Sequence, residues 1–215
     1  GAVPFHMWVP DVYQGAPTPI TAYLSVASKA AAFAIILRIF LDALSPFADV
    51  WIDAIIAIAV LTMALGSFVA LVQTNIKRML AYSAIAHVGF FLLGILTGEG
   101  SGYASAMAYI LIYAVVTLGA FGVILVLSSE EVEADLIEDY SGLSRSHPWA
   151  AFIMLLLMLS LAGIPPTVGF YAKLSVLQAV VNAELTWAAV IAVVFSVVGA
   201  FYYLRIVKVM YFDES

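Results

Sequence analysis

Long apolar segments, separated by short polar stretches, follow one another along the whole chain. They cover residues 20–40, 50–72, 79–96, 103–127, 148–181 and 185–210. An α-helix rises about 1.5 Å per residue and the hydrocarbon core of a bilayer is ~30 Å thick, so roughly 20 apolar residues are enough to cross it. The pattern therefore predicts an all-α polytopic membrane protein with about six transmembrane spans.

The fifth segment, residues 148–181, is too long for one straight span and contains the pair Pro165-Pro166. Proline has no backbone N–H, and its ring clashes with the preceding helical turn. We therefore expect two helical halves joined by an unwound break, whose freed backbone groups need protein or water as partners. Lys173 follows the break by about two turns. Because helical side chains lean toward the N-terminus, its ammonium should approach the break.

Composition supports the membrane assignment and excludes several kinds of chemistry. The chain has 215 residues, of which 65% are hydrophobic and 10% are charged, and this balance excludes an ordinary soluble domain. With no cysteine, it cannot hold disulfides, thiolate-ligated iron–sulfur clusters or cysteine-attached haem. The histidines, His6, His87 and His147, are too scattered to predict a metal site, and no pattern indicates nucleic-acid binding. Because Gly1 is not an initiator Met, we expect a fragment of a longer polypeptide.

The basic residues predict how the chain is oriented. Six spans place five of them on one side of the membrane, namely Lys77, Arg78, Arg145, Arg205 and Lys208. Arg38 alone lies on the opposite side. Loops rich in Lys and Arg stay in the cytoplasm, so the first group should be cytoplasmic, or on the matrix side in an organelle.

Three ionisable side chains fall inside the predicted spans: Lys29, His87 and Lys173. A charge at mid-membrane costs about 2.5 to 3.5 kcal/mol on insertion scales, so such residues need a partner or a function. Each residue also has a purely structural alternative. Lys29 could form an ion pair with a partner on a missing segment, and Lys173 could cap the carbonyls freed at the break. His87 could be an ordinary buried histidine that is hydrogen-bonded beside Ser83.

Two spans also carry stripes of polar residues, which suggest that polar groups line the interior of the bundle. The first consists of Thr21, Ser25, Ser28 and Lys29, and the second of Ser105, Tyr109, Tyr113 and Thr117. Spacings of three and four place each set on one face of its helix. The tyrosines can equally be packing residues with satisfied hydroxyls. The longest polar stretch, residues 128–147, is expected to be a solvated loop or short interfacial helix, or a docking surface for a partner.

Lys29, His87 and Lys173 together predict a proton relay. A lysine removed from water loses part of the stabilisation of its charged form, so it can exchange a proton near neutral pH. Prolines also interrupt the chain twice, at residues 3–10 and at 165–166. Paired interruptions of this kind are typical of inverted-repeat transporters with a site near the membrane midplane.

Three motifs, in order, carry a resemblance to a known family. They are PFHMWVPDVYQGAPTP at residues 4–19, followed by Ala27-Ser28-Lys29, then NIKRMLAYSAIAH at 75–87 and LAGIPPTVGFYAK at 161–173. The chain resembles the subunit N family of bacterial respiratory complex I (NADH:quinone oxidoreductase), the counterpart of mitochondrial NADH dehydrogenase subunit 2. The resemblance covers nearly the whole chain and corresponds to the C-terminal half of such a subunit.

The resemblance implies an antiporter-like inverted-repeat fold. In this interpretation residues 1–19 are the end of a broken helix and a turn, and residues 20–40 are the last span of the first repeat. Residues 50–212 form the second repeat, with five spans and the broken helix at 148–181. Lys29 and Lys173 match the central and exit-side lysines of the family, and His87 matches a histidine on the hydrated path between them. The glutamate and lysine that the family places at proton uptake would precede Gly1.

The implied function is proton translocation coupled to electron transfer from NADH to quinone. No cofactor is expected on this chain, because NADH, FMN, iron–sulfur clusters and quinone would bind partner subunits. The implied partners are the other membrane subunits of complex I and the lipid bilayer. The implied location is the bacterial inner (plasma) membrane, with several passes, or the mitochondrial inner membrane if the source is organellar.

Two alternatives remain open. The first is an Mrp-type cation/proton antiporter subunit, which shares the fold and the membrane lysines, although the run Asp11 to Pro17 favours subunit N. The second is a structural membrane scaffold whose lysines only pair with neighbouring groups.

Overall fold

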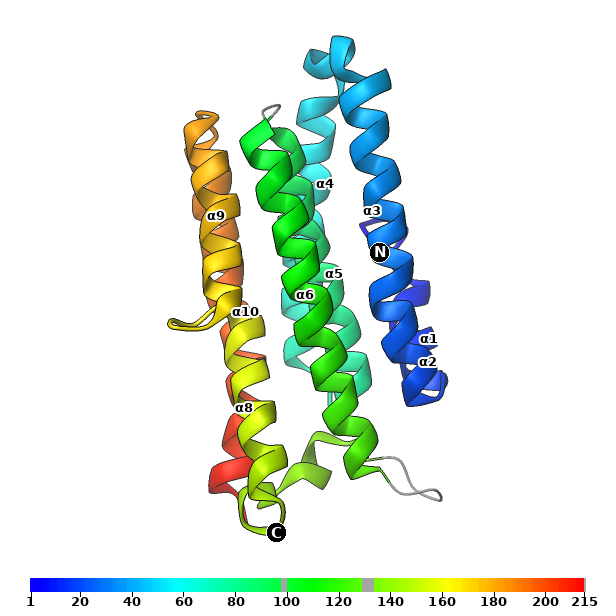
Figure 1. Cartoon of the computed structure of the whole chain (residues 1–215), viewed down its shortest axis with the longest axis vertical. Helices are drawn as coiled ribbons and strands as arrows, with labels where there is room; N and C mark the ends of the chain where they lie inside the picture. Colours follow the sequence, from blue (N-terminus) through cyan, green and yellow to red (C-terminus); the bar gives the residue numbers. More distant parts are fainter. Residues whose placement is uncertain (98–99, 129–133, 215) are drawn as a thin grey trace.

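The computed structural model describes residues 1–97, 100–128 and 134–214. Its helices lie side by side along one axis (Figure 1). They are α1 (Trp8–Gly15), α2 (Thr18–Tyr23), α3 (Lys29–Arg38), α4 (Ala48–Leu71), α5 (Ile76–Leu96), α6 (Gly100–Leu127), α7 (Leu143–Ser146), α8 (Pro148–Ala162), α9 (Val168–Asn182) and α10 (Thr186–Phe212). Five helical segments in these ranges are long and apolar enough to cross a membrane, and α8 is a shorter apolar helix. The predicted all-α architecture of about six spans is confirmed, with α8 and α9 together forming the broken span.

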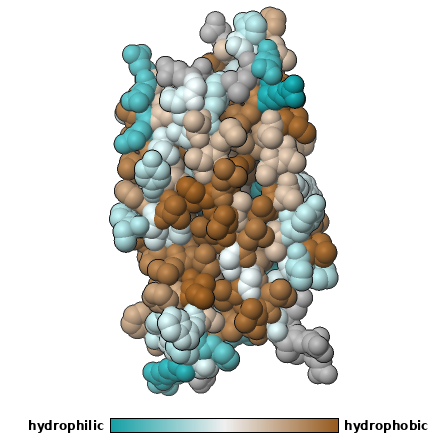
Figure 2. All heavy atoms as spheres, viewed as in Figure 1, coloured by the Kyte–Doolittle hydropathy of each residue, from teal (hydrophilic) through white to brown (hydrophobic). Residues whose placement is uncertain are grey.

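The outer surface of the bundle is apolar around its middle. Large side chains on α6 and α10 remain exposed, among them Leu111, Val115, Val194 and Phe201. Figure 2 shows hydrophobic side chains over the centre of one face and hydrophilic ones gathered toward both ends. An exposed apolar belt of this extent is what a surface in contact with lipid requires.

Helix α5 forms the centre of the bundle. Almost all of its residues are buried, and it packs most extensively against α4. Two glycines permit this close approach, because a methyl group on Gly66 would lie 2.7 Å from the carbonyl oxygen of Tyr82, and one on Gly89 would lie 2.8 Å from that of Ala59. Small residues at helix contacts are the usual means of close packing in membranes. The side chains of α5 are therefore held at fixed positions inside the protein.

The first span contains a feature that the sequence did not predict. Its helix includes wider π-helical turns at Leu24–Ser28 and Ile39–Ala43. Thr21 and Ser25 are buried as expected, but Ser28 is exposed and donates a hydrogen bond to the carbonyl of Leu24 at 2.6 Å. The prediction that Ser28 shares their face was wrong, because a π turn contains an extra residue and rotates everything that follows it.

The predicted break lies between α8 and α9, at mid-height of the bundle (Figure 1). Helix α8 ends at Gly163, which adopts a left-handed conformation with φ of 77°. Its N–H bonds back to the carbonyls of Leu159 and Ser160, both at 3.0 Å. The most exposed part of the break is Pro165-Pro166, which has no N–H to satisfy. The break therefore leaves few unpaired donors toward lipid, as membrane depth requires.

The connection between α6 and α8 is more firmly attached than a solvated loop. Residues 129–133, which include Glu130, Glu131 and Glu133, lie outside the described residues. From 134 onward the segment packs against the start of α5: the N–H of Ile76 donates to the carbonyl of Asp135 at 2.7 Å, and that of Ile137 to the carbonyl of Thr74 at 2.9 Å. The ammonium of Lys77, almost fully buried, lies 3.0 Å from the Asp135 carboxylate. Short helices form at Ile137–Tyr140 and Leu143–Ser146, as the alternative of a short interfacial helix predicted. The segment is nevertheless held against α5 rather than free in solvent, because the buried Lys77 takes Asp135 as its partner.

We predict that Asp135→Asn destabilises the full-length protein. Removing one partner of a fully buried ion pair costs about 3–5 kcal/mol. Because the Asp135 side chain is 31% exposed, we expect less, about 1–3 kcal/mol. The measurement is the thermal unfolding midpoint in detergent, with the exposed Asp53→Asn as the control. Equal midpoints for the two variants would show that the Lys77–Asp135 pair contributes nothing to stability.

Candidate functional site

His87 lies in the buried middle of α5, with a tyrosine on each ring nitrogen. Its Nδ1 is 2.7 Å from the hydroxyl of Tyr109 on α6, and its Nε2 is 3.0 Å from the hydroxyl of Tyr203 on α10. A neutral imidazole has one donor and one acceptor nitrogen, so one tyrosine donates to the ring and the other accepts from it. The Tyr203 hydroxyl also contacts Ser83 Oγ. Ser83 and His87 therefore share a face, as predicted.

Lys173 lies in the first half of α9 and points back toward the break. Its Nζ donates to the carbonyl of Ala162 at 2.9 Å and to Ser196 Oγ on α10 at 2.9 Å. It also lies 5.3 Å from the centroid of the Phe90 ring. The Ala162 carbonyl belongs to the last turn of α8, where the helix dipole favours a positive charge. The prediction that the ammonium approaches the break is confirmed.

Two glycines make room for this arrangement. A methyl group on Gly163 would lie 2.7 Å from Cδ of Lys173 and 3.3 Å from its Nζ. On the other side of the break, the N–H of Gly169 donates to Ser160 Oγ at 3.1 Å, and a methyl group there would overlap the Ser160 carbonyl. The start of α9 can therefore lie directly against the end of α8, with Lys173 between them.

Lys29 is half-buried at the start of α3. Its Nζ lies 3.4 Å from the Tyr113 hydroxyl and 5.5 and 5.4 Å from the ring centroids of Tyr13 and Tyr113. Among residues 1–97, 100–128 and 134–214, no carboxylate forms an ion pair with it. Aromatic faces attract a cation but hold it less firmly than a carboxylate does.

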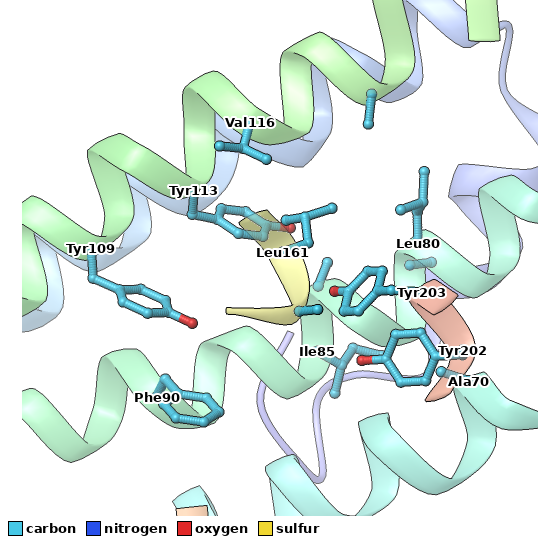
Figure 3. Close-up of a cluster of buried hydrophobic side chains, with 14 of the residues drawn as sticks. Ala70, Leu80, Ile85, Phe90, Tyr109, Tyr113, Val116, Leu161, Tyr202 and Tyr203 are labelled. Carbon is cyan, nitrogen blue, oxygen red and sulfur yellow. The ribbon is translucent and has the colours of Figure 1, made fainter. Parts of the chain in front are cut away.

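Tyrosines connect these groups across the bundle. The ring of Tyr113, which contacts Lys29, lies 4.9 Å from the ring of His87 between centroids. Figure 3 shows the hydroxyls of Tyr109 and Tyr113 from α6, and those of Tyr202 and Tyr203 from α10, directed toward the interior space between these helices. Tyr109 and Tyr113 are therefore polar contacts of the site as well as packing residues.

His87 and Lys173 approach the same interior space without a direct hydrogen bond. Two small cavities, each of about 10 Å³, have both residues in their walls. One lies toward α6 and the helix break, with Ser160 in its wall, and the other lies toward α10, with Ser196 in its wall. A volume of this size is about what one water molecule needs.

Several polar residues of the site were not predicted from the sequence, and one residue that was predicted does not belong to it. Tyr202, Tyr203 and Ser196 belong to α10, which was predicted only as an apolar span. The signal that could have identified them is the presence of hydroxyl-bearing residues within that span. Ser105, assigned to the polar stripe of α6, donates to the carbonyl of Ser101 and lines neither of the two cavities. In the described part of the chain, no cluster of three or more His, Asp or Glu could hold a metal.

Comparison with known sequences identifies relatives of this arrangement. The family model for the transmembrane part of NADH:quinone oxidoreductase and Mrp antiporters matches residues 1–199. NADH-quinone oxidoreductase subunit N of Thioalkalivibrio sulfidiphilus is 59% identical over 214 residues, covering 100% of this chain and 45% of the relative. The corresponding protein of Thiobacillus denitrificans is 58% identical over 213 residues, covering 99% of this chain and 44% of the relative. The chain thus spans less than half the length of these relatives.

Solved structures show the same helix arrangement. A chain of respiratory complex I from Thermus thermophilus with bound aureothin aligns with a TM-score of 0.84 at 34% identity, over 100% of this chain and 47% of that chain. A chain of the Mrp complex from Dietzia sp. DQ12-45-1b aligns with a TM-score of 0.92 at 27% identity, over 99% of this chain and 40% of that chain.

We predict that Gly163→Ala destabilises the full-length protein more than Gly142→Ala does. Both glycines have positive φ, 77° and 67°, so both variants incur the roughly 1–2 kcal/mol cost of a left-handed alanine. A methyl group at Gly163 would in addition meet the Lys173 side chain and displace its ammonium from its two oxygen partners. Thermal unfolding midpoints in detergent measure the difference. Equal decreases would mean that the Lys173 contacts do not depend on Gly163.

Proposed function

Because the chain belongs to the NADH:quinone oxidoreductase/Mrp antiporter transmembrane family, we propose that it is part of a proton-translocating membrane subunit of NADH:quinone oxidoreductase. The identity of 59% to a subunit N supports this choice within the family. The observation that carries the proposal is the buried ammonium of Lys173. It lies at a helix break, its hydrogen-bond partners among the described residues are two neutral oxygens, and it shares two water-sized cavities with His87.

Lys29, His87 and Lys173 act in this proposal as successive proton carriers. The Lys29 ammonium gives a proton to the Tyr113 hydroxyl. A water in the cavity lined by Tyr113, Tyr109 and His87 can pass one on to the Tyr109 hydroxyl, which donates to Nδ1 of His87. The imidazole accepts on one nitrogen and releases from the other, and its two tyrosine partners allow either direction. A water in either cavity can complete the transfer to neutral Lys173. The net result is the movement of one proton, because each hydroxyl on the path gives up one proton and gains another.

The interrupted helices support the proposal of an inverted repeat. Residues 20–40 would be the last span of the first repeat, and residues 50–212 the second repeat. Two breaks mark equivalent positions in this scheme: the proline-rich stretch at residues 3–10, where α1 begins, and the break between α8 and α9. Paired broken helices beside a midplane site are the usual construction of such transporters.

The redox reaction would belong to partner subunits. In this proposal NADH, FMN, the iron–sulfur clusters and quinone bind elsewhere in the complex, and this subunit responds to electron transfer through its contacts with the other membrane subunits. The apolar belt then faces the lipid of the bacterial inner (plasma) membrane, or of the mitochondrial inner membrane if the source is organellar.

An Mrp-type cation/proton antiporter subunit is the second candidate. The TM-score of 0.92 with a chain of the Mrp complex favours it, but that chain is only 27% identical. The run that favours subunit N has a structural role, since Asp11 and Gln14 bind Arg78 at 2.7 and 3.1 Å. Sodium-dependent proton exchange in vesicles without NADH would support the antiporter.

We predict that Lys173→Met in the full-length protein lowers NADH-driven proton translocation by at least about tenfold. A positioned proton carrier contributes roughly 10²–10⁴-fold to a transfer step, and methionine can neither hold nor release a proton. The measurement is acidification of inverted vesicles containing the assembled complex, followed with a pH-sensitive dye and normalised to the amount of complex.

The matched control is Lys208→Met, which removes an exposed lysine near the end of the same bundle that pairs with Asp213 at 3.2 Å. It should pump normally. Unchanged translocation by assembled Lys173→Met complexes would refute the role given to Lys173. Poor assembly with an intact ratio of protons to NADH would instead support a structural scaffold.

A further inference from the structure

The cavity on the α10 side has the chemistry of a water site. Its wall includes Lys173 and Ser196, together with His87, Tyr202 and Tyr203. A buried water needs two to four polar partners, and these side chains supply them. Ser196 is already bonded to the lysine at 2.9 Å, and Tyr203 to the histidine at 3.0 Å. One water in this cavity would therefore lie between two groups that are already attached to the two proton carriers.

Gly199 lies in the same wall, in the middle of α10. Glycine inside a helix is about 1 kcal/mol less favourable than alanine, so its presence here needs a reason. At Gly66 and Gly89 the reason is the backbone of a neighbouring helix. At Gly199 it is different, because the nearest atoms that a methyl group would meet all belong to Tyr202 of the same helix, the hydroxyl being closest at 3.3 Å.

We infer that Gly199 keeps open a one-water site between the Lys173–Ser196 pair and the Tyr202–Tyr203 pair, and thereby provides a route for protons along α10. A methyl group at this position would enter the space beside the Tyr202 hydroxyl. The missing side chain of Gly199 is thus a positioning feature of the relay. This inference rests on the proposed function and specifies one branch of the path between His87 and Lys173.

The transfer through this site balances without any other reactant. The Lys173 ammonium donates a proton to Ser196 Oγ as the serine passes its own proton to the water. The water gives one of its protons to the Tyr203 oxygen, and Tyr203 gives its hydroxyl proton to His87 Nε2. Lysine has lost one proton and histidine has gained one, while serine, water and tyrosine are unchanged. The reverse sequence uses the same atoms.

The test compares Gly199→Ala, Gly199→Ser and Gly122→Ala in the full-length subunit within its assembled complex. Gly122 is a matched control in α6, because a methyl group there meets nothing within 4 Å. We expect Gly199→Ala to lower NADH-driven proton translocation about threefold to tenfold. That is less than the 10²–10⁴-fold of a positioned carrier, because the second cavity leaves a parallel branch. Gly199→Ser should restore most of the rate, since its hydroxyl can accept and donate a proton where the water would.

Normal rates for Gly199→Ala would overturn the inference while leaving the proposed function intact, provided that Lys173→Met in the same preparation remains defective. Equal defects for Gly199→Ala and Gly199→Ser would also overturn it, because a steric disturbance makes no distinction between a methyl and a hydroxymethyl group. If Lys173→Met also pumps normally, the proposed function fails, and the inference fails with it.

A second variant covers the case in which Gly199→Ala does not assemble. Ser196→Ala removes the hydroxyl between Lys173 and the cavity and adds no atom. It should lower translocation by a similar factor, and Ser196→Thr should restore it because the hydroxyl returns. A normal rate for Ser196→Ala would overturn the inference.

Discussion

The contact between the Lys173 ammonium and the Ala162 carbonyl is the interaction on which the rest of the site depends. It requires a helix that ends in the middle of the bundle, because an unbroken helix would use that carbonyl for its own hydrogen bonding. It requires a second helix that begins close enough for its first turns to lie beside the first. It also requires left-handed backbone at Gly163, where any side chain would meet the lysine.

The break and the lysine therefore stabilise each other. The last turn of α8 leaves carbonyls without helical partners, and the ammonium binds one of them at 2.9 Å. The ammonium would be costly in lipid, and the negative end of the α8 dipole offsets part of that cost. The prolines at the tip of the loop carry no N–H, so the chain can turn there without exposing a donor.

Much of this arrangement could be predicted from the sequence, because it depends on local rules. The break was predicted from the length of the apolar segment and from the Pro165-Pro166 pair. The approach of Lys173 to the break was predicted because helical side chains lean toward the N-terminus. His87 was predicted as a site residue because it lies near the middle of its span. These inferences use only positions a few residues apart, where helical geometry is nearly fixed.

The partners of these residues could not be predicted, because they come from distant parts of the chain. Tyr203 meets His87 across 116 positions, and Lys29 meets Tyr113 across 84. Which face of α10 turns inward depends on packing, and the long apolar sequence of that helix gives almost no periodic signal. The π turn before Lys29 was missed for a related reason, since one extra residue in a turn leaves no mark on the hydrophobic pattern.

The absence of a carboxylate from the described partners of Lys173 has a chemical consequence. A carboxylate would bind the ammonium strongly and the neutral amine weakly, so it would hold the proton in place. A serine hydroxyl can accept a hydrogen bond from the ammonium and can donate one to the lone pair of the amine. The Ala162 carbonyl accepts an N–H from either form. Both protonation states of Lys173 therefore find partners in the same two oxygens, with little movement of the surrounding helices. A group in such surroundings is suited to gaining and losing a proton repeatedly, whereas a buried ion pair such as Lys77–Asp135 is suited to staying charged.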